Sequence, residues 1–461
     1  MRGETIEKLR QFAKEFDLLE RLAPFQHLRW SAPSPAALHL DDVSGIPFLD
    51  GIAGIDLYQH RARTRCGDGD LFAAVTEPVP GYEDYCRELL GMGSPTFVKA
   101  EPAGSLIEVA EALRSSPGMA TICDEARSRG GLEVHPYMGI ESVWALAEDV
   151  HQATGVPIQV LAPPPPITWI ANDKANLNRL IAITAGPEYA VDGEQGRDLN
   201  LLADAMLRVA SRHRRIGLKR GRCASAMGNG VYAADEVRNG DPAAILRTFI
   251  ERTEWDGGED LIVCGWLDAI ASPSTQLWIP PHGSGKPRLD GVYEQLLEGE
   301  ECCFLGSRPS ILPAAVNEEL VRASMAVAEG LQWLGYVGRC SFDFVLCGDP
   351  EGAFSVHFTE CNGRWGGTST PMALVDRLVP GPRPAYRAQD VVIEGHIGAP
   401  FSKLLDGLGD SLYRPGRGGN YILYNVGPLE GSGKFDVIAI ADSPERAAAL
   451  IEEDLLNRLG A

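Results

Sequence analysis

Apolar residues along this chain recur at two spacings, one helical and one strand-like, and no unit repeats. Residues 6–19 carry large apolar side chains three or four positions apart, which predicts an amphipathic helix. The same spacing follows Asn317, a candidate helix cap, as far as Leu334, and Gly335 is well placed to end that helix. Short apolar runs such as 96–100 predict strands. The mixture predicts an α+β protein.

Several strand-like runs are followed directly by turn or helix-start signals. Residues 340–347 and 353–361 are separated by the turn-forming segment 348–352, which predicts a β-hairpin. The run 435–441 precedes Ser443-Pro444, a helix cap followed by a proline at the first helical position. The remaining apolar strands are 215–219 and 261–267.

Four consecutive prolines, Pro163–Pro166, interrupt the chain, because proline is excluded from helix interiors and central strands. We place a domain boundary here and expect a strand at 167–170, then a helix that begins at Asn172-Asp173. The 461 residues are too many for one core. The expected fold class is multidomain α+β / α/β, with domains at 1–166, 167–258 and 259–461.

The charge and cysteine content restrict the class of protein. A formal net charge of −21 argues against a nucleic-acid groove or an anionic membrane surface as partner. No run reaches the ~18 apolar residues of a membrane span, and the N-terminus lacks a secretory leader. The ten cysteines include no Cys-x-x-Cys pair. We therefore expect reduced thiols and a cytoplasmic location.

The predicted hairpin carries the most distinctive polar residues of the chain. Side chains alternate along a strand, so Glu360 and Asn362 point the same way, ~7 Å apart. Asp343 lies on the partner strand, and all three offer the oxygen ligands that Mg²⁺ prefers. A structural ion pair with Arg339 or Arg364 is the alternative explanation for these acids.

Two lysines upstream add cationic groups. Lys219 ends a strand and opens the small-residue loop 220–230, whose backbone N–H groups could approach phosphate oxygens. Lys174 lies at the expected start of a helix. Two Gly-Ser-Gly-Lys stretches, at 283–286 and 431–434, lack the remaining residues of a phosphate-binding P-loop and are interpreted as turns.

This ordered set, from Asn172-Asp173-Lys174 through Lys219 to Asp343 and the stretch 359–364, resembles the ATP-grasp superfamily over roughly residues 167–375. The resemblance implies two α+β subdomains that clamp ATP, preceded by an N-terminal α/β domain. It implies ATP and two Mg²⁺ ions as cofactors. The hinge that usually carries Glu contains Val263 and Trp266 here, and Asp268 is the candidate ribose ligand.

The resemblance assigns roles to individual residues. Those for the nucleotide are Lys174, Lys219, Ser225, Met227, Gly228, Val263, Trp266 and Asp268. Those for the metal ions are Asp343, Glu360 and Asn362. The candidate catalytic cations are Arg364 and Arg339, and the candidate substrate contacts are Gln276, Arg308, Thr368 and Ser369.

The reaction implied by this resemblance is amide-bond formation through an acylphosphate. The long flanking regions are most similar to the pheganomycin-type peptide ligases, which implies that a guanidino-bearing, phenylglycine-like amino acid is joined to the amino group of a peptide. The expected partners are thus a small carboxylate and an amine or peptide acceptor, and a homodimer is compatible with the sequence. The alternatives are an amino-acid ligase of other specificity, an ATP-grasp phosphotransferase or carboxylase, and a nucleotide-binding regulator without turnover.

Overall fold

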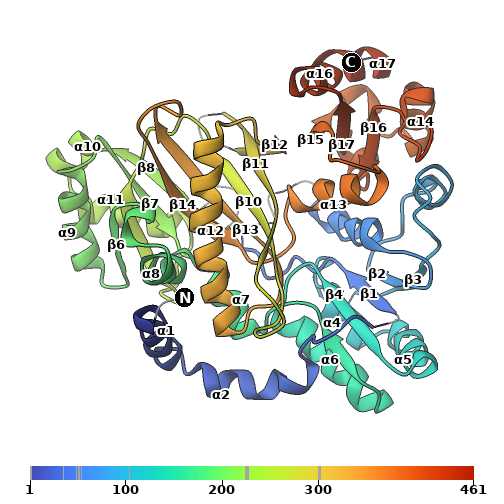
Figure 1. Ribbon diagram of the computed structural model, residues 1–461, viewed down its shortest axis with the longest axis horizontal. Helices are drawn as coiled ribbons and strands as arrows, with labels where there is room; N and C mark the ends of the chain where they lie inside the picture. The colour runs from blue at the N-terminus through green and yellow to red at the C-terminus, as the bar shows by residue number, and fades with distance from the viewer. Residues whose placement is uncertain are drawn as a thin grey trace.

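The computed structural model describes residues 3–34, 36–47, 49, 52, 54–102, 104–223, 228–299 and 303–460. Its strands form three sheets of five, four and eight strands. The four-stranded sheet lies at the left of Figure 1, and the five-stranded sheet lies at the lower right, beneath the last strands of the eight-stranded sheet. No helix within these residues is long and apolar enough to cross a bilayer.

The N-terminal unit is a parallel sheet with the strand order β3-β2-β1-β4-β5. Its strands are β1 (Ala37–Leu40), β2 (Leu71–Ala74), β3 (Thr96–Lys99), β4 (Leu132–Pro136) and β5 (Ile158–Val160). Its helices are η2 (Ile55–Arg65), α3 (Tyr82–Asp84), α4 (Val109–Arg114), α5 (Gly118–Arg129) and α6 (Glu141–Thr154). The buried Trp144 of α6 belongs to the core of this unit. The expected α/β character of this region is confirmed.

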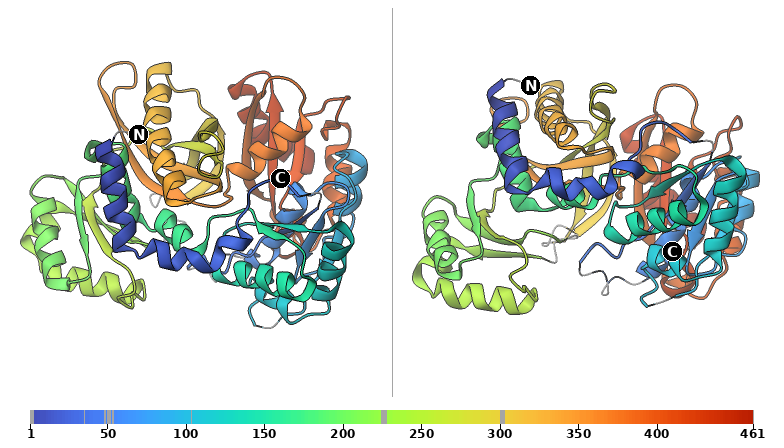
Figure 2. Two further views of the ribbon diagram at one scale, coloured as in Figure 1. Left: turned by 60° about the horizontal axis from the view of Figure 1, so that its bottom comes forward. Right: turned by 90° about the horizontal axis from the view of Figure 1, so that it is seen from below.

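Two α-helices and a short 3-10 helix, η1 (Ala23–Leu28), precede this sheet. The amphipathic α1 (Gly3–Glu15) forms where the spacing predicted it and buries Leu9 and Phe12. It packs on α8 (Lys174–Thr184) and α12 (Ala314–Leu334), and α2 (Leu18–Leu22) leads from there to the N-terminal sheet, as Figure 2 shows.

The central unit is an antiparallel sheet, β6-β9-β7-β8, with helices packed against it. Its strands are β6 (Gly193–Gly196), β7 (Arg215–Arg220), β8 (Asn229–Ala233) and β9 (Leu261–Gly265). Its helices are α9 (Leu199–Ala210), α10 (Ala234–Asn239) and α11 (Pro242–Arg252).

The strand expected at 167–170 is wrong, since these residues form α7 (Pro165–Asn172). A proline at the first helical position has the φ angle that a helix needs, so the prolines start this helix. Ile167, Ile170 and Ala171 are buried, as the helical spacing allows. The next helix, α8, begins as predicted, because Asp173 accepts hydrogen bonds from the backbone N–H groups of Ala175 and Asn176.

The eight-stranded sheet is antiparallel throughout its described pairs, in the order β14-β13-β10-β11-β12-β15-β17-β16. Its strands are β10 (Pro273–Ile279), β11 (Arg288–Glu298), β12 (Cys303–Pro309), β13 (Gly338–Gly348), β14 (Phe354–Asn362), β15 (Ala385–Val392), β16 (Tyr421–Tyr424) and β17 (Lys434–Ala441). Its other helices are α13 (Ser369–Leu378), α14 (Phe401–Leu408), α15 (Leu429–Ser432), α16 (Pro444–Ala449) and α17 (Leu456–Leu459).

Helix α12 covers strands β10 and β11 of this sheet. It begins at Ala314 after Pro313, so Asn317 is not its cap. Asn317 instead bonds Ser310 Oγ and the Leu312 carbonyl, inside the first turn. The helix ends at Gly335, whose φ of +106° suits glycine, as predicted.

Candidate active site

The hairpin β13–β14 forms as the sequence predicted and brings the three proposed metal ligands together. Asp343 pairs directly with Glu360, and Ser341 pairs with Asn362. The register shifts between Asp343 and Phe344, so the hairpin has a bulge beside the acids, a frequent feature next to active sites. Asn362 Nδ2 donates to Asp343 Oδ2 at 2.8 Å and lies 3.5 Å from Glu360 Oε1.

Two acids placed opposite each other on neighbouring strands repel one another. Burial and the charge of Glu360 raise the pKa of Asp343 to about 7. Burial alone would also raise the pKa of Glu360, but the charge of Lys174 and its hydrogen bond, with Arg364 and Lys219 further away, outweigh burial and lower it. The hairpin therefore has one compensated and one uncompensated carboxylate.

This donor set fits a magnesium ion. The uncompensated charge of Asp343 would be neutralised by a cation, and two carboxylates with an amide are oxygen donors of the kind Mg²⁺ takes alongside nucleotide phosphates. Among the described residues, no group of three or more His, Cys, Asp or Glu side chains offers an alternative metal site.

Lys174 is held at this site by both neighbouring units. Its Nζ lies 3.1 Å from Glu360 Oε2 and donates to the Cys223 carbonyl at 3.0 Å. The preceding Asn172 accepts from the Gly363 N–H at 3.0 Å, which fixes the end of β14. The segment 172–174 thus contacts both the hairpin and the loop after β7.

The other residues proposed for the nucleotide lie on the central sheet or beyond it. Lys219 Nζ lies 5.3 Å from the centre of the Trp266 ring, a cation–π contact. Val263 is buried within β9, and exposed Asp268 pairs with Arg215 at 2.6 Å. Their contacts with a nucleotide stay predictions.

The loop after β7 is described only in part. Ser225 and Met227 lie outside the described residues. Gly228 directly precedes β8, and a Cβ atom there would clash with the Cys223 side chain. The close approach of the Cys223 and Arg220 side chains therefore favours glycine at this position.

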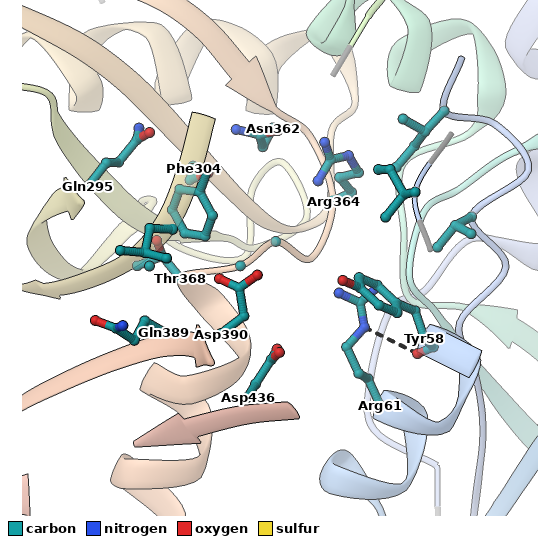
Figure 3. Close-up of a pocket in the computed structure, with 18 of the residues that line it drawn as sticks. Tyr58, Arg61, Gln295, Phe304, Asn362, Arg364, Thr368, Gln389, Asp390 and Asp436 are labelled. Atoms are coloured by element: carbon teal, nitrogen blue, oxygen red, sulfur yellow. Dashed lines mark hydrogen bonds between the residues drawn. The ribbon is translucent and has the colours of Figure 1, made fainter. Parts of the chain in front are cut away.

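A cavity of about 400 Å³ opens beside the hairpin (Figure 3). All three proposed metal ligands line it, together with the predicted Arg364, Gln276 and Thr368. Arg364 donates to the Tyr137 hydroxyl at 3.0 Å and to the Trp365 carbonyl at 2.9 Å. Gln276 is almost fully buried, and its Oε1 has no hydrogen-bond partner among the described residues.

Three other predicted site residues do not line this cavity. Arg339 pairs with Asp290 at 2.9 Å and stacks on Trp365, 4.9 Å from the ring centre. Arg308 pairs with Glu294 at 3.1 Å. Ser369 Oγ accepts from the Gly366 N–H at 2.7 Å and so shapes the loop before α13. Their local partners indicate a structural role for all three.

Sequence reasoning missed the far side of the cavity. Its residues come from η2 and from strands β11, β12, β15 and β17: Tyr58, Arg61, Gln295, Phe304, Gln389, Asp390, Lys434 and Asp436. One signal in the sequence was available, because three arginines within 61–65 fall in a segment that is largely buried. Arginine is rarely buried without a partner or a function.

Comparisons with known proteins identify the fold. No protein-family model matches the chain, and no curated protein matches it in sequence. An ADP complex of N5-carboxyaminoimidazole ribonucleotide synthetase (purK) is similar with a TM-score of 0.53 at 10% identity, over 92% of this chain and 97% of that chain.

Two biotin carboxylases give similar results. The biotin carboxylase domain dimer of Hydrogenobacter thermophilus 2-oxoglutarate carboxylase, with MgADP, ADP and bicarbonate, has a TM-score of 0.55 at 13% identity, over 92% of this chain and 89% of that one. The Campylobacter jejuni biotin carboxylase, in complex with a β,γ-ATP ligand, has a TM-score of 0.55 at 14% identity, over 92% and 91%. The chain has the ATP-grasp fold, and identities this low establish the fold and not the substrate.

Proposed function

We propose that this protein is an ATP- and magnesium-dependent ligase that joins a carboxylic acid to an amine through an acylphosphate. The observation that carries the proposal is the pairing of Lys174 with Glu360, opposite the uncompensated Asp343 and in a cavity that Arg364 also lines. Phosphoryl transfer from ATP depends mainly on positioning and charge neutralisation. This arrangement supplies both without a catalytic histidine.

The proposal assigns each step to groups of the site. Lys174 and Lys219 would bind the phosphates, and Asp343, Glu360 and Asn362 would hold Mg²⁺, which neutralises charge on the transferred group. A substrate carboxylate oxygen attacks the γ-phosphorus, the bond to the β,γ-bridging oxygen breaks, and ADP leaves. The amine nitrogen then attacks the acyl carbon, phosphate leaves, and the amine loses its proton. Arg364, oriented by Tyr137, would stabilise the negative charge in both steps.

The finer proposal concerns the substrates. The cavity beside the hairpin has the size of a small-molecule site and both charged and apolar walls, which supports an organic acid and amine such as amino acids or a peptide. The comparisons lend no support to a pheganomycin-type peptide ligase in particular.

A second candidate is an ATP-dependent carboxylase that uses bicarbonate as the acid. It is favoured by the shared fold with the Hydrogenobacter thermophilus domain, whose structure contains bicarbonate. A cavity of about 400 Å³ is larger than this small anion requires, so we rank it second.

The test is incubation with ATP, Mg²⁺ and panels of amino acids and peptides, followed by mass spectrometry. Ligation gives ADP, phosphate and a product whose mass equals the two substrates less water. AMP with pyrophosphate would contradict the acylphosphate route. Incorporation of ¹³C-bicarbonate would favour the carboxylase, and nucleotide binding without ADP formation would indicate a regulator.

A further inference from the structure

The side of the cavity away from the hairpin contains a buried arginine with unused donors. Arg61 of η2 is 8% exposed, and its Nε donates to the Tyr58 carbonyl at 3.2 Å (Figure 3). Within the described part of the chain, its two terminal nitrogens have no hydrogen-bond partner. The rings of Tyr58 and Tyr137 lie 4.7 and 5.0 Å from the guanidinium carbon. The two rings cover the faces of the guanidinium, so its N–H edge is available to bind a planar anion.

The charge of Arg61 is only partly compensated. Its nearest acid, Asp41, is fully buried and lies 3.6 Å from Nε. Asp41 makes its closer contact, at 2.7 Å, with Arg65. One carboxylate is thus shared by two guanidinium groups, which leaves one surplus positive charge at the cavity wall.

The opposite wall carries two acids and one lysine. Asp390 of β15 and Asp436 of β17 are paired directly across the strands, and both line the cavity. Asp390 is neutralised by Lys434 at 2.6 Å. Asp436 Oδ2 accepts only from Asn425 Nδ2, at 3.1 Å, and its enclosed Oδ1 has no hydrogen-bond partner among the described residues.

These two walls meet at Lys434, whose Nζ lies 5.8 Å from the centre of the Tyr58 ring. Arg61 and Asp436 lie on different elements on the two sides of the cavity in Figure 3, and they form no ion pair. A free cation in this space would leave Arg61 uncompensated, and a free anion would leave Asp436 uncompensated. A ligand that carries both charges satisfies both walls.

We propose that Arg61 and Asp436 bind the two charged groups of a zwitterionic amino acid, its carboxylate on Arg61 and its ammonium on Asp436. The inference rests on the proposed function, for which it names the class of one substrate. Phe304, Leu305 and Tyr424 add apolar surface to the same cavity, so the side chain of this amino acid is apolar. The cavity also contains Glu360 and Arg364, so the bound amino acid shares a space with the reacting groups.

The first experiment tests the ligand chemistry on the full chain without ATP. Calorimetric titration and thermal unfolding are measured with L- and D-phenylalanine and with L- and D-leucine. The matched probes are 3-phenylpropionate and 4-methylpentanoate, which lack the ammonium, and 2-phenylethylamine and 3-methylbutylamine, which lack the carboxylate. We expect at least one amino acid to bind, with both of its analogues at least ~10-fold weaker, as each loses a charged hydrogen bond. Failure of all four amino acids to bind, or equal binding of an analogue, would overturn the inference.

The second experiment assigns each charge to its residue. Asp436→Asn, which is isosteric, should weaken binding of the amino acid about tenfold and leave binding of the carboxylate analogue unchanged. Arg61→Gln should weaken binding of the amino acid and of the carboxylate analogue and leave binding of the amine analogue unchanged. Arg61→Lys should restore part of the affinity. If the residues had only a structural role, the variants would bind all three probes equally less tightly, and that outcome would refute the assignment. The exposed Asp410→Asn and Arg417→Gln are the matched controls.

The outcomes separate this inference from the proposed ligase. If the amino acid binds but ATP is never consumed, the ligase proposal fails and the subsite stands. If ATP is consumed with amino acids while Asp436→Asn and Arg61→Gln keep the parent KM, the ligase stands and the subsite fails.

Discussion

Two cross-strand pairs of acids occur in the eight-stranded sheet, at opposite ends of one cavity. Asp343 faces Glu360 on the hairpin, and Asp390 faces Asp436 on β15 and β17. In each pair a lysine contacts one acid, Lys174 at 3.1 Å and Lys434 at 2.6 Å.

In each pair the acid that the lysine does not contact, Asp343 or Asp436, has a pKa raised to about 7 by burial and by the neighbouring acid. The surroundings of the two pairs differ. An amide contacts one acid of each pair, Asn362 at the hairpin and Asn425 at the other pair. The hairpin pair has Arg364 and Lys219 as further cations, whereas the other pair has apolar walls and a single arginine opposite. By our proposals, the same arrangement of charges binds a metal ion at one end and an organic ammonium at the other.

The largest effect is expected at the hairpin pair. Glu360→Gln should lower ATP turnover by ~10³-fold or more, because it removes a proposed metal ligand and the partner of Lys174. ADP release measures the effect, and binding of the amino acid should be unchanged. Glu318→Gln, on the exposed side of α12, is the control. If the variant hydrolyses ATP at the parent rate, the hairpin pair does not bind a catalytic metal ion and the proposed difference between the two acid pairs is wrong.

The second-largest effect is expected for Lys174→Met, with a loss of ~10²-fold in kcat/KM for ATP, since it removes a nearly buried cation from the proposed phosphate site. The apparent affinity for Mg²⁺ should rise, because Glu360 loses its competing partner. Both quantities come from ADP release at varied ATP and Mg²⁺. Exposed Lys286→Met is the matched control. A loss confined to thermal stability would assign Lys174 a structural role only.

The sequence was sufficient for the hairpin end and insufficient for the other, for a physical reason. Asp343, Glu360 and Asn362 lie on consecutive strands joined by a short turn, so strand alternation alone brings them together. Asn172-Asp173-Lys174 is likewise local, and its capping residue is legible in the sequence.

Arg61 and Asp436 come from opposite ends of the chain, and tertiary contacts such as the packing of η2 on α13 and of Tyr82 and Tyr85 on Phe401 bring their units together. No local sequence pattern predicts that these two residues line the same cavity. The failure at 167–170 has a different origin, because a short apolar run after prolines fits either a strand or a helix until its packing is known.

Arg339 tests whether a buried arginine near the site takes part in the chemistry. Arg339→Gln should lower the free energy of unfolding by about 2 kcal/mol, because nearly buried Asp290 then keeps only its exposed partner Arg288. Its kcat should stay within a few-fold of the parent, unlike that of Arg364→Gln. Denaturant unfolding and ADP release measure the two effects. A large loss of kcat at unchanged stability would restore Arg339 to the catalytic set.

The smallest effect concerns Asp436 and follows from its pKa. Burial, then Asp390, raise that pKa to about 7, well above the value of an unfolded aspartate, so the folded state holds a proton that the unfolded state has released. Stability from this group is therefore present at low pH and is lost as pH rises from about 4 through 7. One pKa unit corresponds to about 1.4 kcal/mol, and with screening by cavity water we expect a loss of ~1–2 kcal/mol between pH 5 and pH 8.

Asp436→Asn carries no such charge and should lose less stability over this range, so the Tm of the parent should fall relative to that of the variant as pH rises. Saturating amino acid should reduce the difference, since a bound ammonium stabilises the ionised carboxylate. Melting curves of both proteins at matched pH measure it, with Asp410→Asn as the exposed control. A parent Tm that rises relative to Asp436→Asn would show that Asp436 is compensated within the fold, and the parallel between the two acid pairs would then fail.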